Sequence, residues 1–385
     1  MNLLKRGKQV EKNIKPLTVV LTGGGTGGHI YPAISIGRAI KGCYPDSAIV
    51  YFGTDQGLEA KLIKEEKWPF YTVAAAGLKR KITFKAVESL LISAKGYFQA
   101  LKQLKQIQPT LVIGTGGYVC GPVVLAAACL KIPTIIHEQN AYPGLTNRLL
   151  SRVVDQVLVT FPQSESYFSK RATVIHTGLP IRETIVQTDR KKGLELLNLK
   201  DGFRVLVVGG SQGAKSINES MLEIYRDKKE YKNFQWLHIV GSGSYHSYQE
   251  KLKQVGIDLA TFGNIRIVPY IFQMEAALSV ADLVIGRAGA SFLAEIMAKG
   301  LPSILVPYPH AAENHQEFNA RALQDGNAAI IFKDEELSGE KLFSTVQQLS
   351  ESPQKLQEMA ANAKKMGRTD ALKVILAQVA AILGQ

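Results

Sequence analysis

The sequence predicts an α/β protein built from two Rossmann-like domains that face a cleft. Apolar runs with strand character alternate with helical stretches along the chain, which favours parallel sheets covered on both faces. A strand followed by a glycine-rich turn and a helix begins twice, at Gly23 and again at Gly209. The chain of 385 residues is also longer than one core usually supports.

The first domain is predicted from five apolar runs with helical stretches between them. The runs are 17–23, 47–53, 110–116, 133–138 and 155–160. The second domain repeats the pattern with a strand, a glycine turn and a helix over 203–221, and then with runs at 235–241, 264–270, 281–286, 302–308 and 328–333. Strands spaced by helices of this length are typical of βαβ units.

Pro180 and a cluster of charge interrupt this alternation near 180–190, and there we place the domain boundary. The expected domains are 17–182 and 183–366. The final helix, within 367–385, is amphipathic and is expected to pack back, with the N-terminal domain as one candidate surface. Residues 1–16 are a basic leader without the apolar segment of a secretory signal, and we expect them to contribute little to the fold.

The net charge of +13, from 46 basic and 33 acidic residues, implies an anionic partner. Nucleic acid, phosphorylated metabolites and an anionic membrane surface all qualify. The apolar run 123–130 is much shorter than the roughly 18–20 residues of a membrane span. Cys43, Cys120 and Cys129 are odd in number and lack the spacing of metal ligands, which suits a reducing cytoplasm.

The first glycine turn contains Gly23, Gly24, Gly25, Gly27 and Gly28. These residues leave backbone N–H groups uncovered, as expected where an anion binds at a helix start, and Pro32 suits the first turn of that helix. The alternatives are a tight turn without a ligand and a dinucleotide-binding turn. The second is disfavoured because Asp55 lies further along the chain than the usual spacing of about 20 residues to the ribose-binding acid.

His29 follows the glycines at the start of the predicted helix. The positive end of a helix dipole favours the neutral imidazole, which can accept a proton. A structural or merely exposed histidine is the alternative. Further along, the segments 114–122 and 137–144 follow predicted strands, at the edge where open α/β sheets bind ligands. Glu138 and Asn140 lie there, as candidate site residues or as a buried helix cap and a turn former.

In the second domain, the turn at 209–216 offers Ser211 and backbone amides to a phosphate. Glu295 lies in the early turns of a helix closed by Gly300 and Pro302, where its carboxylate could accept hydrogen bonds from a ribose diol or simply complement the helix dipole. Between 307 and 320, His310, Asn314, His315 and Gln316 are expected to point into the cleft. No D-x-D pair occurs, so we expect no metal, and phosphate charge would meet helix ends, amides and Arg182.

The segment 78–105 has seven basic residues and one glutamate, interleaved with apolar residues. A solvated helix face is the ordinary explanation. Clustered cations beside apolar side chains also fit a segment that docks on anionic lipid; its candidate membrane-associating residues are Lys79, Arg80, Lys81, Ile82, Phe84 and Lys85. No recognised nucleic-acid motif accompanies this charge, so nucleic acid is not an expected partner.

Seven segments together resemble the MurG family of membrane-associated N-acetylglucosaminyltransferases of peptidoglycan synthesis. They are "GGTGGHIYPA" (24–33), "GTGGYVCGP" (114–122), "HEQNAYPGLTNR" (137–148), "TGLPIR" (177–182), "GGSQGA" (209–214), "RAGASFLAEI" (287–296) and "NHQEFNA" (314–320). The resemblance implies a two-domain glycosyltransferase of the B type on the cytoplasmic face of the membrane. Its donor would be UDP-N-acetylglucosamine (UDP-GlcNAc) and its acceptor undecaprenyl-diphosphate-linked N-acetylmuramoyl-pentapeptide (lipid I). No cofactor is implied. A diacylglycerol glycosyltransferase and a UDP-sugar epimerase are the alternatives.

The resemblance also implies roles for individual residues. His29 would be the general base or position the acceptor, with Glu138 behind it. The expected donor contacts are Thr26, Gly27 and Gly28 at the sugar and diphosphate, Asn140 and Gln316 at the GlcNAc, Arg182 and Ser211 at the phosphates, Ile271 at the uracil, and Ala290, Ser291, Phe292, Leu293, Ala294 and Glu295 around the nucleoside. The chain departs from the family pattern at Leu179 and Ala288, where Asn and Ser are usual.

Overall fold

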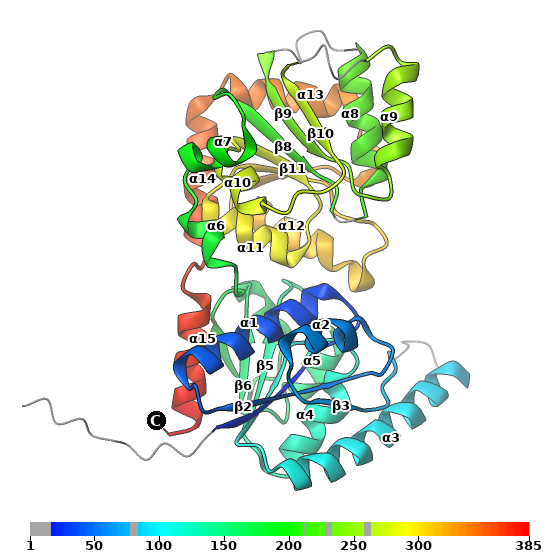
Figure 1. The fold of residues 1–385 in the computed structure, drawn as a ribbon, viewed down its shortest axis with the longest axis vertical. Coiled ribbons are helices and arrows are strands. Elements are labelled where there is room, and N and C mark those ends of the chain that lie inside the picture. The colour runs from blue at the N-terminus through cyan, green and yellow to red at the C-terminus, as the bar shows by residue number, and fades with distance from the viewer. Residues whose placement is uncertain (1–16, 78–83, 211, 228–232, 258–262, 385) are drawn as a thin grey trace, which may run out of the picture.

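The structure is a computed structural model that describes residues 17–77, 84–210, 212–227, 233–257 and 263–384. Two α/β lobes lie one above the other along the long axis, the N-terminal lobe below and the C-terminal lobe above (Figure 1). Each lobe is built on a parallel sheet with helices on both faces. The predicted fold class is therefore confirmed.

The N-terminal sheet has the strand order β3-β2-β1-β4-β5-β6-β7, and all of its pairs are parallel. Its strands are β1 (Thr18–Thr22), β2 (Ala48–Gly53), β3 (Phe70–Thr72), β4 (Leu111–Gly114), β5 (Thr134–Glu138), β6 (Gln156–Val159) and β7 (Thr173–His176). The helices of this part of the chain are α1 (Gly27–Cys43), α2 (Leu58–Glu66), α3 (Phe84–Ile107), α4 (Cys120–Cys129) and α5 (Leu145–Leu150), with a 3-10 turn η1 (Pro162–Tyr167).

The C-terminal sheet has the order β10-β9-β8-β11-β12-β13, again all parallel. Its strands are β8 (Arg204–Val208), β9 (Gln235–Ile239), β10 (Ile265–Val268), β11 (Leu283–Gly286), β12 (Ser303–Leu305) and β13 (Ala329–Ile331). The helices are α6 (Glu183–Gln187), α7 (Arg190–Leu197), α8 (Lys215–Asp227), α9 (Tyr245–Gln254), α10 (Met274–Ser279), α11 (Ala290–Lys299), α12 (His315–Asp325), α13 (Gly339–Ser350), α14 (Pro353–Met366) and α15 (Ala371–Ile382), with 3-10 turns η3 (Ala312–Asn314) and η4 (Asp334–Glu336).

Each sheet is buried on both faces, which explains why its strands are continuous apolar runs. In β1, Val19 and Leu21 join the core that contains α1 and α15, whereas Val20 joins the core that contains α3 and α4. In β8, Val207 packs with α8 and Leu206 with α11. Each such side chain contributes about 1.5–3 kcal/mol when fully buried, so the central strands are held firmly and their carboxyl ends provide a rigid edge.

The structure differs from the sequence-based prediction in two local respects. Helix α1 begins at Gly27, so Pro32 lies in its second turn rather than its first. The glycines are helical here because Thr26, in an extended conformation, accepts hydrogen bonds through its carbonyl from the N–H groups of His29 and Ile30. The other difference is that β3 and β7, the outermost strands of the N-terminal sheet, were not predicted; both are short and only partly buried.

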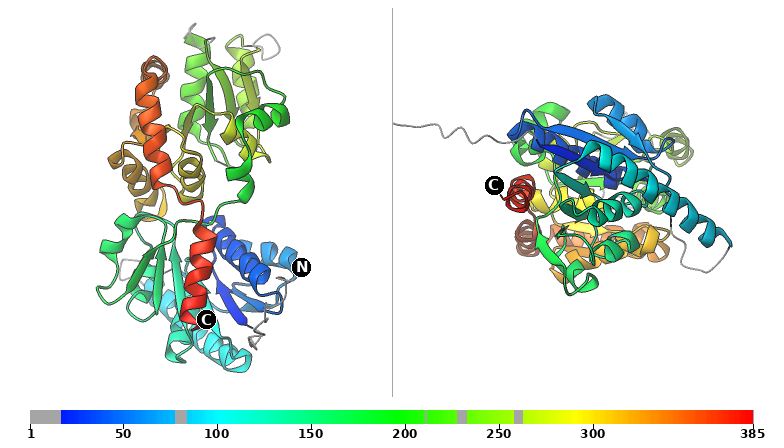
Figure 2. Two further views of the ribbon diagram at one scale, coloured as in Figure 1. Left: turned by 90° about the vertical axis from the view of Figure 1, so that its left-hand side faces the viewer. Right: turned by 90° about the horizontal axis from the view of Figure 1, so that it is seen from below.

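The chain crosses between the lobes twice. After β7 it runs through 177–182 into α6, and after α14 it returns to the N-terminal lobe as α15. Ile375 and Val379 of α15 are buried in the core that contains α1, and α15 lies beside the N-terminal lobe in both views of Figure 2. The two crossings contact each other, since the Arg368 guanidinium donates to the carbonyl of His176 at 3.0 Å.

Candidate active site

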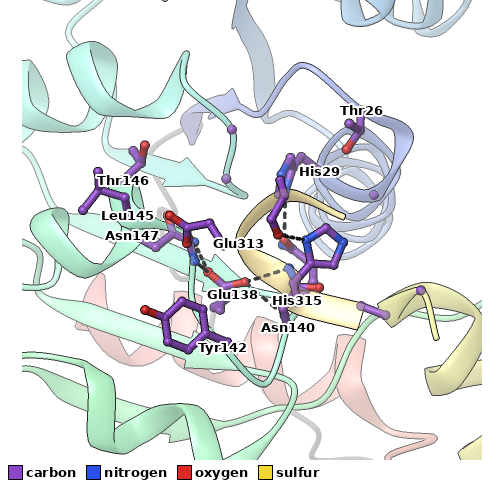
Figure 3. A pocket seen from close by; sticks show the side chains of 18 of the residues that line it. Thr26, His29, Glu138, Asn140, Tyr142, Leu145, Thr146, Asn147, Glu313 and His315 are labelled. Atoms are coloured by element: carbon purple, nitrogen blue, oxygen red, sulfur yellow. Dashed lines mark hydrogen bonds between the residues drawn. The ribbon is translucent and has the colours of Figure 1, made fainter. Parts of the chain in front are cut away.

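Two cavities share Gly289, Ser291 and Phe292 in their linings; the first is lined by residues of both lobes and the second by residues of the C-terminal lobe. The first, of about 630 Å³, lies at the carboxyl ends of β1, β4 and β5, and Figure 3 shows its labelled side chains. The second, of about 710 Å³, lies at the carboxyl ends of β8, β9 and β11. Ligands bind at this edge in open parallel sheets, so the shared wall makes one continuous candidate site.

The first glycine turn is partly filled by a side chain of the protein itself. The buried carboxylate of Glu59 accepts a hydrogen bond from the N–H of Gly25 at 3.4 Å and two from Thr54. The N–H of Gly24 donates to the carbonyl of Gly116 at 3.3 Å. The expectation of uncovered amides is therefore wrong at Gly24 and Gly25. The donors left for a ligand are at the start of α1.

His29 lies on the wall of the first cavity, with one ring nitrogen engaged by the protein. Nδ1 lies 3.0 Å from Oε1 of Gln139 and 3.1 Å from the carbonyl oxygen of Thr115. Gly116 makes room for the ring, because a Cβ at that position would lie 2.6 Å from Nδ1 and the residue has φ +106°. Among the described residues no hydrogen bond engages Nε2, the other ring nitrogen.

Glu138 does not contact His29; it organises the loop after β5. Its Oε1 accepts from the backbone N–H and the side-chain amide of Asn140, and its Oε2 accepts from Asn147 at 2.8 Å and from the N–H of Gly144 at 3.2 Å. The side chain is 1% exposed. Four donors on one buried carboxylate hold residues 138–147 in place, which corresponds to the capping alternative for this residue.

Asn140 joins the two lobes beside the cavity. Its side-chain oxygen accepts from the amide of Asn319 on α12 at 3.1 Å, and the oxygen of Asn319 accepts from the N–H of Ala141 at 2.8 Å. The rings of Tyr142 and Phe318 stack across the same junction, 4.6 Å apart. Because Asn319 is fully buried, these contacts set the loop after β5 against the C-terminal lobe.

Glu295 lies on the wall of the second cavity, next to another carboxylate. The Arg182 guanidinium is 3.6 Å from Glu295 and 3.4 Å from Glu275. Burial raises the pKa of Glu295 to about 7, although the charge of Arg182 opposes this shift. This carboxylate therefore changes its ionisation near neutral pH.

The remaining predicted residues lie partly in the two cavities and partly elsewhere. Thr26, Gly28, Ala290, Ser291 and Phe292 line the first cavity, and Ile271 and Gln316 line the second. Leu293 and Ala294 are buried, Leu293 in the core, Gly27 opens α1, and Arg182 lies beside Glu295. Ser211, Lys79, Arg80, Lys81 and Ile82 lie outside the described residues, and Phe84 and Lys85 begin α3.

The two departures from the family pattern are buried in the structure. Leu179 is 2% exposed and Ala288 is fully buried. The backbone of Ala288 links two site residues, since its N–H donates to Gln316 and its carbonyl accepts from Asn319. Gln316 also accepts from the N–H of Tyr308. The contacts of Ala288 are made by main-chain atoms, so the missing hydroxyl does not disturb them.

Of the other residues expected in the cleft, some line a cavity and some do not. His315 lines the first cavity, and burial is the main cause that lowers its pKa. His310 and Asn314 line neither cavity. Sequence reasoning missed Gln139 and Asn319, although both lie inside motifs that it quoted. Both lie close in sequence to predicted site residues, Gln139 next to Asn140 and Asn319 three residues after Gln316. A neutral amide side chain does not indicate a role until its hydrogen-bond partners are known.

A third cavity, of about 490 Å³ and mostly apolar, lies between α3, α4 and α5. It shares Tyr118 and Thr146 with the first cavity. Leu90, Leu91 and Phe98 of α3 are exposed beside it, each above 60%. No helix in the described part of the chain is long and apolar enough to cross a membrane.

Two facing Rossmann-like lobes are compatible with a two-domain glycosyltransferase, and the matching family models show that the chain is one. The models of the glycosyltransferase family 28 N-terminal and C-terminal domains match residues 19–159 and 204–375. A Desulforamulus reducens protein named UDP-N-acetylglucosamine--N-acetylmuramyl-(pentapeptide) pyrophosphoryl-undecaprenol N-acetylglucosamine transferase is 47% identical over 368 residues, 95% of this chain and 99% of the relative. A Moorella thermoacetica protein of the same name is 47% identical, over 94% of this chain and 97% of its own.

The crystal structure of Acinetobacter baumannii MurG matches with a TM-score of 0.76 and 30% identity, over 94% of this chain and 99% of that one. The chain therefore belongs to the MurG family of glycosyltransferases. A UDP-GlcNAc 2-epimerase from Neisseria meningitidis has a TM-score of 0.66 at 14% identity, over 94% of this chain and 99% of that one, which shows a shared fold alone.

Proposed function

We propose that this chain transfers N-acetylglucosamine from UDP-GlcNAc to the 4-hydroxyl of the N-acetylmuramoyl group of lipid I, giving lipid II and UDP. The observation that carries this proposal is identity of 47% across nearly the whole of both chains to a relative named for that reaction. The continuous site supports it, because a base on one lobe faces the wall of a nucleotide-sized cavity on the other.

In the proposed reaction, Nε2 of His29 takes the proton of the acceptor hydroxyl as its oxygen attacks the anomeric carbon. The attack comes from the face opposite UDP, so the bond from that carbon to the phosphate oxygen breaks as the new bond forms. A single displacement converts the α-linked donor to a β-linked product. A base within hydrogen-bond reach contributes about 10²–10⁴ in rate.

The donor is proposed to lie across the shared wall. Its uracil contacts the backbone of Ile271, its ribose hydroxyls donate to Glu295, and its GlcNAc contacts Asn140 and Gln316. Arg182 and Ser211 approach the phosphates. The start of α1 at Thr26, Gly27 and Gly28, together with the turn before α8, stabilises the charge that develops on the leaving diphosphate. Ala290, Ser291, Phe292, Leu293 and Ala294 surround the nucleoside.

We propose the N-terminal lobe (17–182) as the acceptor and membrane side and 183–366 as the donor side, with 367–385 returning to the N-terminal lobe. The exposed apolar residues of α3 support a peripheral position on an anionic membrane surface at its cytoplasmic face, since in the sequence they follow the basic segment that begins at Lys79. Apolar residues beside clustered cations are typical of interfacial segments.

The direct test is transfer of labelled GlcNAc from UDP-GlcNAc to a lipid I analogue, with diacylglycerol as the alternative acceptor in a parallel assay. We expect a β-linked disaccharide product with lipid I and no product with diacylglycerol. Labelled diacylglycerol, or release of free sugar epimerised at C2, would contradict the proposal.

A further inference from the structure

The orientation of the Gln139 side-chain amide is fixed by its surroundings. Its Nε2 lies 2.8 Å from the carbonyl oxygen of Thr115, 3.1 Å from the carbonyl oxygen of His137 and 3.1 Å from Nδ1 of His137. Carbonyl oxygens only accept hydrogen bonds, so the NH₂ group must face them. The side-chain oxygen then faces His29, and the side chain is 2% exposed, which leaves no room for solvent to substitute.

His137 completes the hydrogen-bond chain. Its Nε2 lies 2.9 Å from the carbonyl oxygen of Gly178, on the crossing between the lobes, so Nε2 carries the proton and Nδ1 accepts from Gln139. The ring is fully buried, and burial lowers the pKa of His137 to about 4. At neutral pH the ring is therefore uncharged and its Nδ1 remains an acceptor.

We propose that Gln139 is the positioning residue that fixes the tautomer of His29, and that His137 holds Gln139 in the required orientation. Both partners of Nδ1 of His29, the carbonyl of Thr115 and Oε1 of Gln139, accept hydrogen bonds, so Nδ1 carries the proton of the neutral ring. Nε2 is then the acceptor, and it faces the cavity. A reversed amide at Gln139 would present a donor to Nδ1 and favour the inactive tautomer. The inference rests on the proposed role of His29 as base.

The test compares three variants of the full chain. Gln139→Met keeps the length of the side chain and removes both hydrogen-bonding groups. Gln139→Glu keeps an acceptor toward His29. Ser164→Ala is the matched control, because its buried hydroxyl also donates to a backbone carbonyl of the N-terminal lobe, that of Phe161 at 2.7 Å, away from the site.

We expect Gln139→Met to lower kcat by about ten-fold or more, with the KM for UDP-GlcNAc within about two-fold of wild type. Gln139→Glu should retain more activity than Gln139→Met, because its carboxyl group keeps an acceptor toward His29 and, when protonated on the other oxygen, a donor toward the carbonyl of Thr115. Titratable groups that line the same cavity, among them His315, Glu138 and Glu313, are unchanged in these variants. Equal losses in Gln139→Met and Ser164→Ala would overturn the proposal.

A direct readout does not depend on the variants folding. In wild-type protein labelled with ¹⁵N-histidine, the His29 ring at pH 8 should show a protonated Nδ1 and an unprotonated Nε2 in ¹H–¹⁵N correlation spectra. The opposite tautomer would refute the assignment. His29→Ala, assayed alongside, separates the role of His29 as base from the role of Gln139 in positioning it. Full activity in His29→Ala would refute the base. A loss of activity in His29→Ala together with full activity in Gln139→Met would refute only the positioning role.

Discussion

The two glycine-rich turns begin equivalent strand–turn–helix units, yet their chemistry differs. In the first turn, the carboxylate of Glu59 and the carbonyl of Gly116 bind the N–H groups of Gly25 and Gly24. In the second, the N–H groups of Gly209 and Gly213 donate to the carbonyls of Ile239 and Gly210, and Gly210 and Gly213 line a cavity. A carboxylate side chain thus occupies the first turn, on the lobe that presents His29, whereas among the described residues no carboxylate binds the N–H groups of the second turn. We expect an acid–base side on the N-terminal lobe and an anion-binding side on the C-terminal lobe.

The largest expected effect is on the acid–base side. His29→Ala should lower kcat by about 10²–10⁴, because the attacking hydroxyl loses its proton acceptor, while the dissociation constant for UDP changes by less than about three-fold. Steady-state kinetics and calorimetry with UDP measure the two quantities. Unchanged turnover would show that His29 is not the base. If the affinity for UDP fell by the same factor as kcat, His29 would also serve donor binding, and the proposed division of roles between the lobes would be wrong.

Gly116→Ala tests the packing under His29. Its φ of +106° and the 2.6 Å approach of a Cβ to Nδ1 of His29 mean that the new methyl group displaces the ring, and the unfavourable backbone costs about 1–3 kcal/mol. We expect kcat to fall by about 10–10² and thermal stability to decrease. Gly42→Ala on α1, where a Cβ would meet open space, is the control. If Gly116→Ala lowers thermal stability but its kcat, corrected for the folded fraction, equals that of wild type, the argument that Gly116 positions His29 is contradicted.

Glu295→Gln tests the anion-binding side. The ionised carboxylate should accept both ribose hydroxyls, and its pKa of about 7 means that UDP binding should strengthen as pH rises from about 5.5 to 7.5. Glu295→Gln should bind UDP about ten-fold more weakly at pH 8, since a charged hydrogen bond is lost, and should lose this pH dependence. Glu340→Gln, on the exposed start of α13, should keep both the affinity and the pH dependence.

The same group links stability to pH. Because its pKa is raised in the folded protein, Glu295 holds its proton more tightly when the chain is folded than when it is unfolded. The free energy of unfolding should therefore fall as pH rises from about 4.5 to about 7, by on the order of 3 kcal/mol from this group. The side chain is only 17% exposed, so solvent screens the effect weakly. Urea denaturation at several pH values measures it, and Glu295→Gln should flatten this part of the profile.

Much of the fold could be predicted because the central strands are buried on both faces and therefore form unbroken apolar runs. The edge strands β3 and β7 were not predicted because "FYT" and "TVIH" are too short and too exposed to form such apolar runs. The start of α1 was placed late because glycine and proline in sequence resemble a loop, whereas the carbonyl of Thr26 starts the helix before them.

The candidate site could be located from its motifs, but the hydrogen bonds between its residues could not be predicted. Glu59 reaches the first glycine turn from α2, 34 positions from Gly25, and nothing local in either segment indicates that contact. Glu138 and Gln139 are neighbours in sequence, and alternation along the chain turns one toward the loop and the other toward His29. Only the tertiary structure shows which of the two side chains forms a hydrogen bond with His29.

The smallest expected effect concerns divalent ions. If the turn before α8 binds the diphosphate through backbone amides and the helix start, chelation should leave turnover nearly unchanged, because no ion is needed to neutralise the phosphates. We expect EDTA to change kcat by less than about three-fold, with added Mg²⁺ giving no larger recovery, and the absence of a D-x-D pair in the sequence motivates this expectation. The matched measurement is the binding of UDP with and without EDTA. Loss of both turnover and binding on chelation would show that an ion supplies the charge that the amides of the second turn are proposed to supply.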